Sequence, residues 1–317
     1  MVFFIDFLKA LAACLITNAH YTGIYPTDLI ANGGLIGDII FFAVSGWCLY
    51  SINDSFLIWY GKRLYRCYLS VTLITLLYIV LGFYSLEEHG VLWWFIYPTA
   101  YHFVTSIVLL YIPFYLVMKT ELFRNRLPYV MLTVLGFALI WYFFIYDKSF
   151  YHIDNVREPM IRVLFFESML LGAWFRQNDA CLRGGVHLWH IPAAILSFAA
   201  YFGSKILFSR YPGFSEYQIL NQFLIFTLLY FFFHIAVSFS SYLERLPNWF
   251  KSCVLFLPQM TLEIYVVQYV LIDLLRPAFG FPLNWFLLTG AILVSAFLLN
   301  RICDYLSLKR LMKLRKK

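Results

Sequence analysis

Apolar runs recur from one end of the chain to the other, each close to the length of about 20 residues that an α-helix needs to cross a membrane. No long polar stretch lies between them that could form a second, soluble core. The sequence therefore predicts an all-α integral membrane protein, a single bundle of about ten transmembrane helices. The predicted spans are residues 2–21, 34–52, 67–84, 101–118, 129–147, 161–176, 188–207, 217–239, 254–275 and 283–303.

Composition agrees with a membrane protein. Of the 317 residues, 62% are hydrophobic and 13% are charged, whereas about 25% are charged in a typical soluble domain. The first run lacks the basic n-region of a signal peptide and is too long for its apolar core, so we expect it to be retained as the first span. The six cysteines form no C-x-x-C pair and no zinc-ligand spacing, which predicts neither a disulfide framework nor a metal site.

Basic residues predict the orientation of the chain. With a cytoplasmic N-terminus, 17 of the 24 Lys and Arg residues fall on the cytoplasmic side, six fall on the other side and Lys9 lies within the first span. By the positive-inside rule, both termini are expected in the cytoplasm of a multi-pass plasma (inner) membrane protein. The same placement accounts for the net charge of +7 without a nucleic-acid partner. Residues 308–317 are expected to form a basic cytoplasmic tail that contacts lipid headgroups.

Three polar residues interrupt the first apolar run: Asp6, Lys9 and His20. An offset of eleven is close to three helical turns, so Lys9 and His20 are expected on one face, about 16 Å apart along the helix axis. An ammonium group inside a membrane is costly unless it is paired or hydrated, which makes Lys9 a candidate functional residue. The alternatives are an ion pair of Lys9 with Asp6 and a simple interfacial position for His20 beside Tyr21.

Three motifs with this placement carry a family resemblance. Lys9 and His20 have the spacing of a basic residue, ten residues and a histidine. The stretch IGDIIFFAVSG (36–46) reproduces most of a G-x-D-x-F-F-x-x-S-G pattern, with Gly37 and Asp38 adjacent here. The next predicted cytoplasmic loop holds R-x-x-R as Arg63 and Arg66. In these motifs the chain resembles the membrane-bound acyltransferase family 3, and the likeness extends over residues 1–307 through FFESMLLGAWF (165–175) and TLEIYVVQ (261–268).

The resemblance implies an O-acyltransferase that moves an acyl group, expected to be acetyl, from cytoplasmic acyl-CoA to a hydroxyl of an extracytoplasmic glycan, as in polysaccharide modification. Two residues depart from the family pattern: Lys9 replaces the commoner Arg, and Gln268 stands where many relatives have His. The chain also lacks the soluble hydrolase-like domain of some relatives. Glycan capture is therefore expected to rest on the loops of the membrane domain or on a partner, such as a glycan-assembly protein or a second copy.

His20 is the candidate general base, because an imidazole titrates near neutral pH and can accept the proton of a sugar hydroxyl. Asp38 follows a short loop after His20 and could orient the imidazole; the alternative role of Asp38 is to cap the second span. Arg63 and Arg66 could bind the phosphates of acyl-CoA, as the resemblance favours, or could simply set the topology.

Glu263 is predicted at a depth close to that of Lys9, which suggests a buried Lys9–Glu263 pair; its alternative is hydrogen bonding between helices. Arg162 is a candidate for substrate contact or a structural ion pair. Other polar and aromatic residues expected on the outer side could contact a sugar or form an interfacial belt: Arg157, Glu158, Glu167, Trp93, Trp94 and Tyr101.

Two other functions compete with acyl transfer. A transporter or glycan flippase would also carry charges at mid-membrane depth, but the sequence shows neither an internal repeat nor a matched pair of Gly- or Pro-broken spans, which would favour transport. A membrane scaffold for glycan assembly has no sequence signature of its own, and only an activity measurement separates it from an enzyme.

Overall fold

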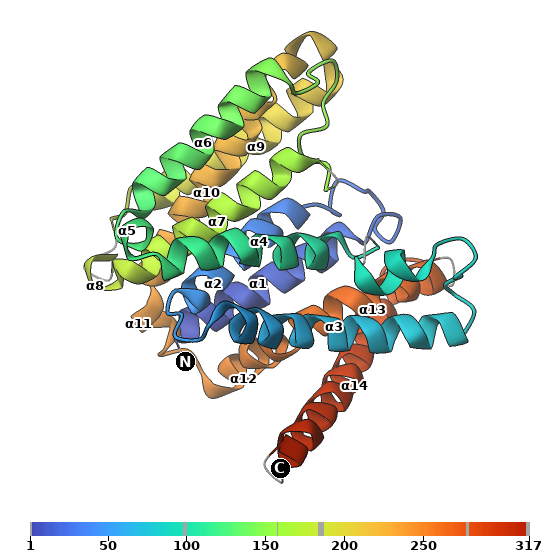
Figure 1. Ribbon diagram of the computed structural model, residues 1–317. Helices are drawn as coiled ribbons and strands as arrows, with labels where there is room; N and C mark the ends of the chain where they lie inside the picture. The colour runs from blue at the N-terminus through green and yellow to red at the C-terminus, as the bar shows by residue number, and fades with distance from the viewer. Residues whose placement is uncertain (1, 98–99, 157, 183–186, 277–278, 315–317) are drawn as a thin grey trace. The chain divides into compact units, whose positions relative to one another are not determined.

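A computed structural model describes residues 2–97, 100–156, 158–182, 187–276 and 279–314. The chain is 77% helical and contains no β-strand in this described part, which confirms the predicted all-α class. Each predicted span coincides with at least one helix (Figure 1). The longer helices are α1 (Phe3–Ala19), α2 (Gly34–Leu49), α3 (Phe56–Val80), α4 (His102–Lys119), α6 (Leu127–Phe144), α7 (Pro159–Gln177), α9 (His190–Arg210), α10 (Ile219–Ser238), α12 (Asn248–Phe256), α13 (Thr261–Leu275) and α14 (Leu283–Leu314).

Short helical turns connect several of these helices. They are the π-helix η1 (Leu92–Ile96), α5 (Glu121–Arg124), α8 (Asp179–Leu182), the 3₁₀-helix η2 (Pro212–Tyr217), α11 (Ser240–Leu243) and the 3₁₀-helix η3 (Leu257–Gln259).

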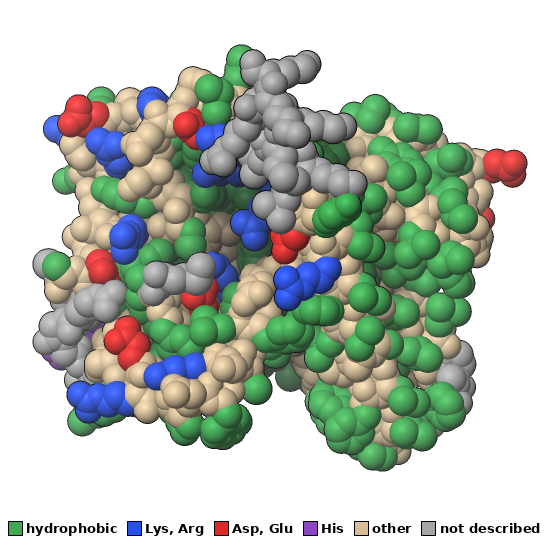
Figure 2. All heavy atoms as spheres, turned by 90° about the horizontal axis from the view of Figure 1, so that it is seen from below, with side chains coloured by type: hydrophobic (Ala, Val, Ile, Leu, Met, Phe, Trp, Pro, Cys, Tyr) green, Lys and Arg blue, Asp and Glu red, His purple; other side chains and the backbone are tan. Residues whose placement is uncertain are grey.

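Six helices of the described chain are long and apolar enough to cross a membrane, namely α3, α4, α6, α9, α10 and α14. A seventh candidate is the bent pair of α12 with η3 and α13. The remaining predicted spans coincide with α1 and α2, which are short, and with α7, which carries Arg162, Glu167 and Arg176. In Figure 2, Lys and Arg side chains gather with Asp and Glu in one part of the face, and apolar side chains cover much of the rest.

The third span begins earlier than its apolar run predicts. Helix α3 starts at Phe56, so the R-x-x-R residues Arg63 and Arg66 lie within a helix, and the prediction that they lie in a loop is wrong. Residues 56–61 carry no charge and are followed by three basic residues within 62–66, which a helix tolerates but which lower the average apolar character of the segment. Three positions apart on a helix, the two arginines project from the same side, about 4.5 Å apart along the axis.

The ninth predicted span, 254–275, is not one straight helix. Helices α12 and α13 meet at an angle of 73° across the break at η3. Pro258 lies in that break, where its missing N–H and its ring are incompatible with a continuous α-helix. Glu263 therefore lies in the first turn of α13. Its predicted depth counted residues along a straight span, and that argument does not hold.

The chain divides into two compact units. Unit 1 comprises residues 1–8, 38–54 and 109–248, and unit 2 comprises residues 9–37, 55–108 and 249–317. In unit 1, α2 and α7 approach closely through two reciprocal glycine contacts. The backbone of Met169 occupies the place where Gly46 would carry a Cβ atom, and the backbone of Ala43 does the same for Gly172. Only glycine fits at either position, which is typical of close helix packing in membranes.

The rest of unit 1 packs α7 against α6 and α10, and α10 against α9. Large side chains on the outer faces of α6 and α9 are exposed, for example Phe137 at 70% and Leu196 at 71%. Exposed apolar rings and chains on this scale fit a surface that contacts lipid rather than water.

Unit 2 is built around α13, which packs against both α3 and α14. The first turn of α2 also belongs to this unit and lies close to α1: a Cβ atom on Gly37 would lie 2.8 Å from the carbonyl oxygen of Ala12, and one on Gly34 would lie 2.8 Å from Cβ of Ala19. Gly37 of the family-like motif therefore serves the contact between the two helices. These neighbours fix the end of α1, where His20 follows.

Candidate functional site

His20 lies in the turn directly after α1 and is half-buried in unit 2. Its ring meets two tyrosines of α13: the ring centroids of His20 and Tyr269 are 5.1 Å apart, and those of His20 and Tyr265 are 6.5 Å apart, both edge to face. Tyr265 and Tyr269 are four residues apart, so one helix face presents both rings to the histidine.

Tyr101, which is fully buried, completes this tyrosine group. Its ring lies 5.7 Å from that of Tyr269 and 6.3 Å from that of Tyr265. The backbone N–H of Phe103 donates to Tyr265 Oη at 3.2 Å. The tyrosine group of Tyr101, Tyr265 and Tyr269 is thus a tightly packed wall beside His20.

Behind this wall, a second layer of aromatic residues connects α3 with α13. Tyr78 Oη donates to the carbonyl oxygen of Val267 at 2.8 Å. Tyr84 stacks on Trp94 with ring centroids 4.2 Å apart, and Trp94 Nε1 donates to the carbonyl oxygen of Ser85 at 3.1 Å. Trp94, one of the residues expected to contact a sugar or form an interfacial belt, is buried in this packing.

Within the described chain, aromatic rings contact His20 but no hydrogen bond reaches its imidazole. An imidazole held by ring edges keeps both nitrogens available to a substrate hydroxyl. Packing against aromatic rings therefore orients His20 within unit 2, and no carboxylate of the described part of this unit is hydrogen-bonded to it.

Glu263 is buried in the same unit and has a specific partner. Ser70 Oγ of α3 donates to Glu263 Oε1 at 2.7 Å, and Cys303 Sγ of α14 lies 3.4 Å from the same hydroxyl. Arg66, one turn before Ser70, interacts electrostatically with Glu263. Glu263 thus joins α13 to α3, in agreement with the alternative prediction that it forms a hydrogen bond between helices.

Of the two arginines of R-x-x-R, Arg63 is held by its own helix. Its Nη1 donates to the carbonyl oxygen of Trp59 at 2.7 Å, and its guanidinium carbon lies 3.9 Å from the centre of the Trp59 ring. Arg66 is exposed. A guanidinium fixed over an aromatic ring and an exposed neighbour one turn away present two positive charges on one side of α3.

The remaining predicted residues are placed as follows. Lys9 lies in α1 and is half-buried, and its pair with Glu263 stays a prediction. Asp38 and Arg162 belong to unit 1, so their roles beside His20 also stay predictions. Asp38 is the fifth residue of α2, which rules out its alternative role as the N-cap. Arg162 is in the first turn of α7, and Arg157 lies outside the described residues.

Gln268 is the most unusual polar residue of unit 2. It is completely buried in α13, and neither its Nε2 nor its Oε1 has a hydrogen-bond partner within the described chain. A buried side-chain amide without partners costs free energy.

The comparison with protein families decides what kind of protein this is. Residues 2–301 match the family described as an acyltransferase domain. The chain belongs to the membrane acyltransferase family 3. No curated protein and no solved structure matches the chain. The family and the apolar helices together make it a multi-pass membrane acyltransferase.

In this membrane acyltransferase, sequence reasoning found His20 but missed the two α13 tyrosines beside it. Their signal was the spacing of four residues in TLEIYVVQY (261–269), which places two rings on one face of a helix. Ser70, the partner of Glu263, gave no signal, because a serine in an apolar helix is commonly a packing residue.

A cavity of about 400 Å³ lies in unit 2 between α1, α13 and α14. Asn18 and Tyr21, which lie close to His20 in the sequence, are among the residues that line this cavity. Tyr25 Oη donates to Asn18 Oδ1 at 2.6 Å and accepts from Trp285 Nε1 at 3.0 Å. Tyr21 Oη and Thr289 Oγ1 are 3.0 Å apart. These polar groups pair with one another, most of the other lining residues are apolar, and His20 is not among them.

Proposed function

We propose that this membrane acyltransferase moves an acyl group, which we expect to be acetyl, from cytoplasmic acyl-CoA to a hydroxyl of an extracytoplasmic glycan. The observation that carries the proposal is the half-buried His20, packed against Tyr265 and Tyr269 in a chain of this family. A histidine that packs between aromatic rings and has no hydrogen-bond partner among the described residues is suited to receive a proton from a bound alcohol.

The chemistry needs one base and one leaving group. An imidazole nitrogen of His20 takes the proton of the sugar hydroxyl as the oxygen attacks the thioester carbonyl carbon. The carbon–sulfur bond then breaks, and the protonated imidazole returns its proton to the departing coenzyme A sulfur. The products are an O-acylated sugar and free coenzyme A, and His20 is regenerated.

On the donor side, Arg63 and Arg66 are the proposed contacts of the coenzyme A phosphates. Arg63 is already oriented by Trp59, and Arg66 is exposed to a ligand. Guanidinium groups bind phosphate oxygens with two parallel hydrogen bonds, which a loop-borne lysine does less well. Lys9 and Asp38 complete the proposed machinery, with Lys9 on the donor path and Asp38 as an orienting carboxylate.

On the acceptor side, the cavity that Tyr25, Asn18 and Trp285 line is the proposed place for a sugar ring. Its aromatic faces can cover the ring, and its hydroxyl and amide groups can exchange hydrogen bonds with sugar hydroxyls. Arg162 is a proposed further contact or a structural ion pair.

We further propose ten spans with both termini in the cytoplasm. Six helices and the bent pair have the required length and apolar character, and α1, α2 and α7 supply the other three. Helix α1 would be about 26 Å long at 1.5 Å per residue, a little short of the hydrocarbon core of about 30 Å. The basic residues of the connecting segments support this orientation.

The test is a transfer assay with purified protein in lipid nanodiscs, acetyl-CoA labelled in the acetyl group and a polysaccharide acceptor. We expect label in the glycan, detected by mass spectrometry as added acetyl groups, and none with an Arg63→Ala, Arg66→Ala double variant. Transport of the glycan across the membrane without any acylation would contradict the proposal and favour the flippase.

A further inference from the structure

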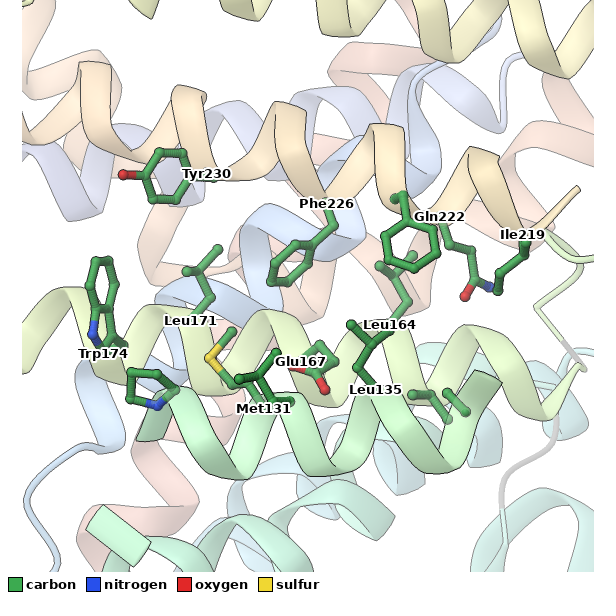
Figure 3. A pocket seen from close by; sticks show the side chains of 15 residues that line it. Met131, Leu135, Leu164, Glu167, Leu171, Trp174, Ile219, Gln222, Phe226 and Tyr230 are labelled. Carbon is green, nitrogen blue, oxygen red and sulfur yellow. The ribbon is translucent and has the colours of Figure 1, made fainter. Parts of the chain in front are cut away.

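A cavity of about 420 Å³ lies within unit 1, and none of the residues proposed above for acyl transfer lines it. Helices α6, α7 and α10 enclose it, and its volume falls within the range of about 300–1,000 Å³ that is usual for small-molecule sites. Figure 3 shows side chains from all three helices converging on the cavity. Its lining is almost entirely apolar, as in Met131, Leu135, Leu171 and Phe226.

One carboxyl group interrupts this apolar lining. Glu167, near the middle of α7, is 8% exposed, and its Oε1 has no hydrogen-bond partner within the described chain. Figure 3 places Glu167 among Met131, Leu135 and Leu164. An unpaired carboxyl group in such surroundings is costly, so a bound molecule that completes its hydrogen bonding would be favoured there.

A second polar residue of the cavity wall, Gln222, already has a hydrogen-bond partner. Gln222 of α10 is 7% exposed, and its Nε2 lies 3.5 Å from the carbonyl oxygen of Ile153. Trp174 and Tyr230 also line the cavity, but Glu167 is the one acidic residue among the lining residues, and its Oε1 is buried without a partner in the described chain. A hydrocarbon chain alone would fill the cavity but would leave Oε1 unpaired.

We propose that the α6–α7–α10 cavity binds the chain of a long-chain amphiphile with a neutral hydrogen-bonding head, such as a fatty alcohol, and that Glu167 hydrogen-bonds this head. The apolar walls match the chain, and the buried carboxyl group matches a hydroxyl group. A charged head is disfavoured because no basic residue lines the cavity. A helix from a second protein is disfavoured too, because an α-helix is about 10–12 Å across and covers a face instead of entering a cavity of this volume.

This site is independent of the proposed acyl transfer, because binding can be measured without turnover. The probes are a photoreactive long-chain fatty alcohol and the alkane of the same length with the same photoreactive group. Purified full-length protein in nanodiscs is irradiated with each probe, and the labelled peptides are identified by mass spectrometry. We expect the alcohol to label α6, α7 and α10 more strongly than the alkane does, by about tenfold for one hydrogen bond to the carboxyl group.

Four variants complete the test. Leu135→Trp fills the cavity and should abolish labelling, whereas Phe137→Trp on the same helix, exposed and outside the cavity lining, should not. Glu167→Leu should remove the preference for the alcohol while the alkane still binds. Glu167→Gln, which keeps the shape and a hydrogen-bonding group, should retain part of that preference.

Equal labelling of the wild-type cavity by alcohol and alkane would overturn the proposal, because Glu167 would then make no contribution to binding of the hydroxyl group. Equal loss of labelling in Leu135→Trp and Phe137→Trp would also overturn it, because the label would then report lipid contact in general. Failure of the acyl-transfer assay would leave these results unchanged, so the two proposals fail separately.

Discussion

Gln218 in unit 1 and Gln268 in unit 2 are both completely buried, yet their surroundings differ. Gln218 Oε1 accepts from the backbone N–H groups of His152 and Ile153, each at 2.9 Å, and its Nε2 donates to the carbonyl oxygen of Phe150 at 3.0 Å. Gln268 makes none of these contacts within the described chain. The first amide holds a loop in place, and the second makes no side-chain hydrogen bond in the described chain.

The same contrast separates the acidic residues of unit 1. Asp154 Oδ2 accepts from Tyr151 and Asn221 and forms an ion pair with Lys205 at 3.2 Å. Burial, and then the charge of Asp154, raise the pKa of Tyr151, so this tyrosine stays a hydrogen-bond donor. Glu167 has no such set of partners. Asp154 thus joins the loop before α7 to α9 and α10, whereas Glu167 forms no such link in the described chain.

The largest effect that would test this division is expected at His20. His20→Ala should lower the transfer rate by about 10²–10⁴-fold, the usual contribution of a general base, and should leave the thermal unfolding temperature unchanged. His89→Ala is the matched control, because His89 is an exposed histidine that stacks on Trp93. A fully active His20→Ala protein would remove His20 from the mechanism.

Gln218→Leu should give the largest loss of stability. Three hydrogen bonds of about 1 kcal/mol each disappear, and two backbone N–H groups are left unpaired, so we expect a loss of about 3 kcal/mol. Denaturant unfolding in detergent measures it, and Gln177→Leu, at an exposed position of α7, should change the unfolding free energy by less than about 0.5 kcal/mol. Equal effects of the two substitutions would show that the loop does not depend on Gln218.

Gln268→Leu should act in the opposite direction. Removing an unpartnered buried amide should leave the unfolding free energy unchanged or raise it by about 1 kcal/mol, while transfer becomes slower if the amide contacts the donor. Parallel unfolding and transfer measurements on Gln268→Leu and Gln218→Leu make the comparison direct. A loss of stability as large as that of Gln218→Leu would mean that Gln268 is structural.

The smallest predicted effect concerns Ser70. Ser70→Ala removes the hydrogen bond to Glu263 and should cost about 1 kcal/mol of unfolding free energy. In a Glu263→Gln background the same change should cost less, because a neutral amide is a weaker acceptor than a carboxylate. A double-mutant cycle measures the difference, and a coupling energy of zero would contradict the link between α3 and α13.

The sequence predicted most of the helices, because each span is a long apolar run. It failed where the chain departs from that simple signal. Basic residues hid the first turns of α3, and Pro258 broke the ninth span although the surrounding residues are apolar. In both places the residue types are plain in the sequence. An average of apolar character over a segment, however, depends neither on which face of a helix the side chains occupy nor on whether a backbone N–H is missing.

The candidate site was predictable only in part. His20 could be proposed because its spacing from Lys9 is visible in the sequence, whereas the change to Gln at position 268 indicated only a departure from many relatives and not that this amide is buried without a partner in the described chain. The partners of Gln218 are backbone groups of a loop, and the residue types of that loop do not predict these hydrogen bonds. Glu167 was expected on the outer side as a sugar contact, whereas its position in an apolar cavity depends on three helices that are distant in sequence.

The reciprocal contacts of Gly46 and Gly172 have a consequence for how the protein is made. Helix α2 leaves the ribosome long before α7, so its glycine-containing face waits in the membrane without the backbone that will cover it. A chain truncated before α7 exposes that groove permanently. The close fit of the two helices can therefore form only after α7 has been synthesised.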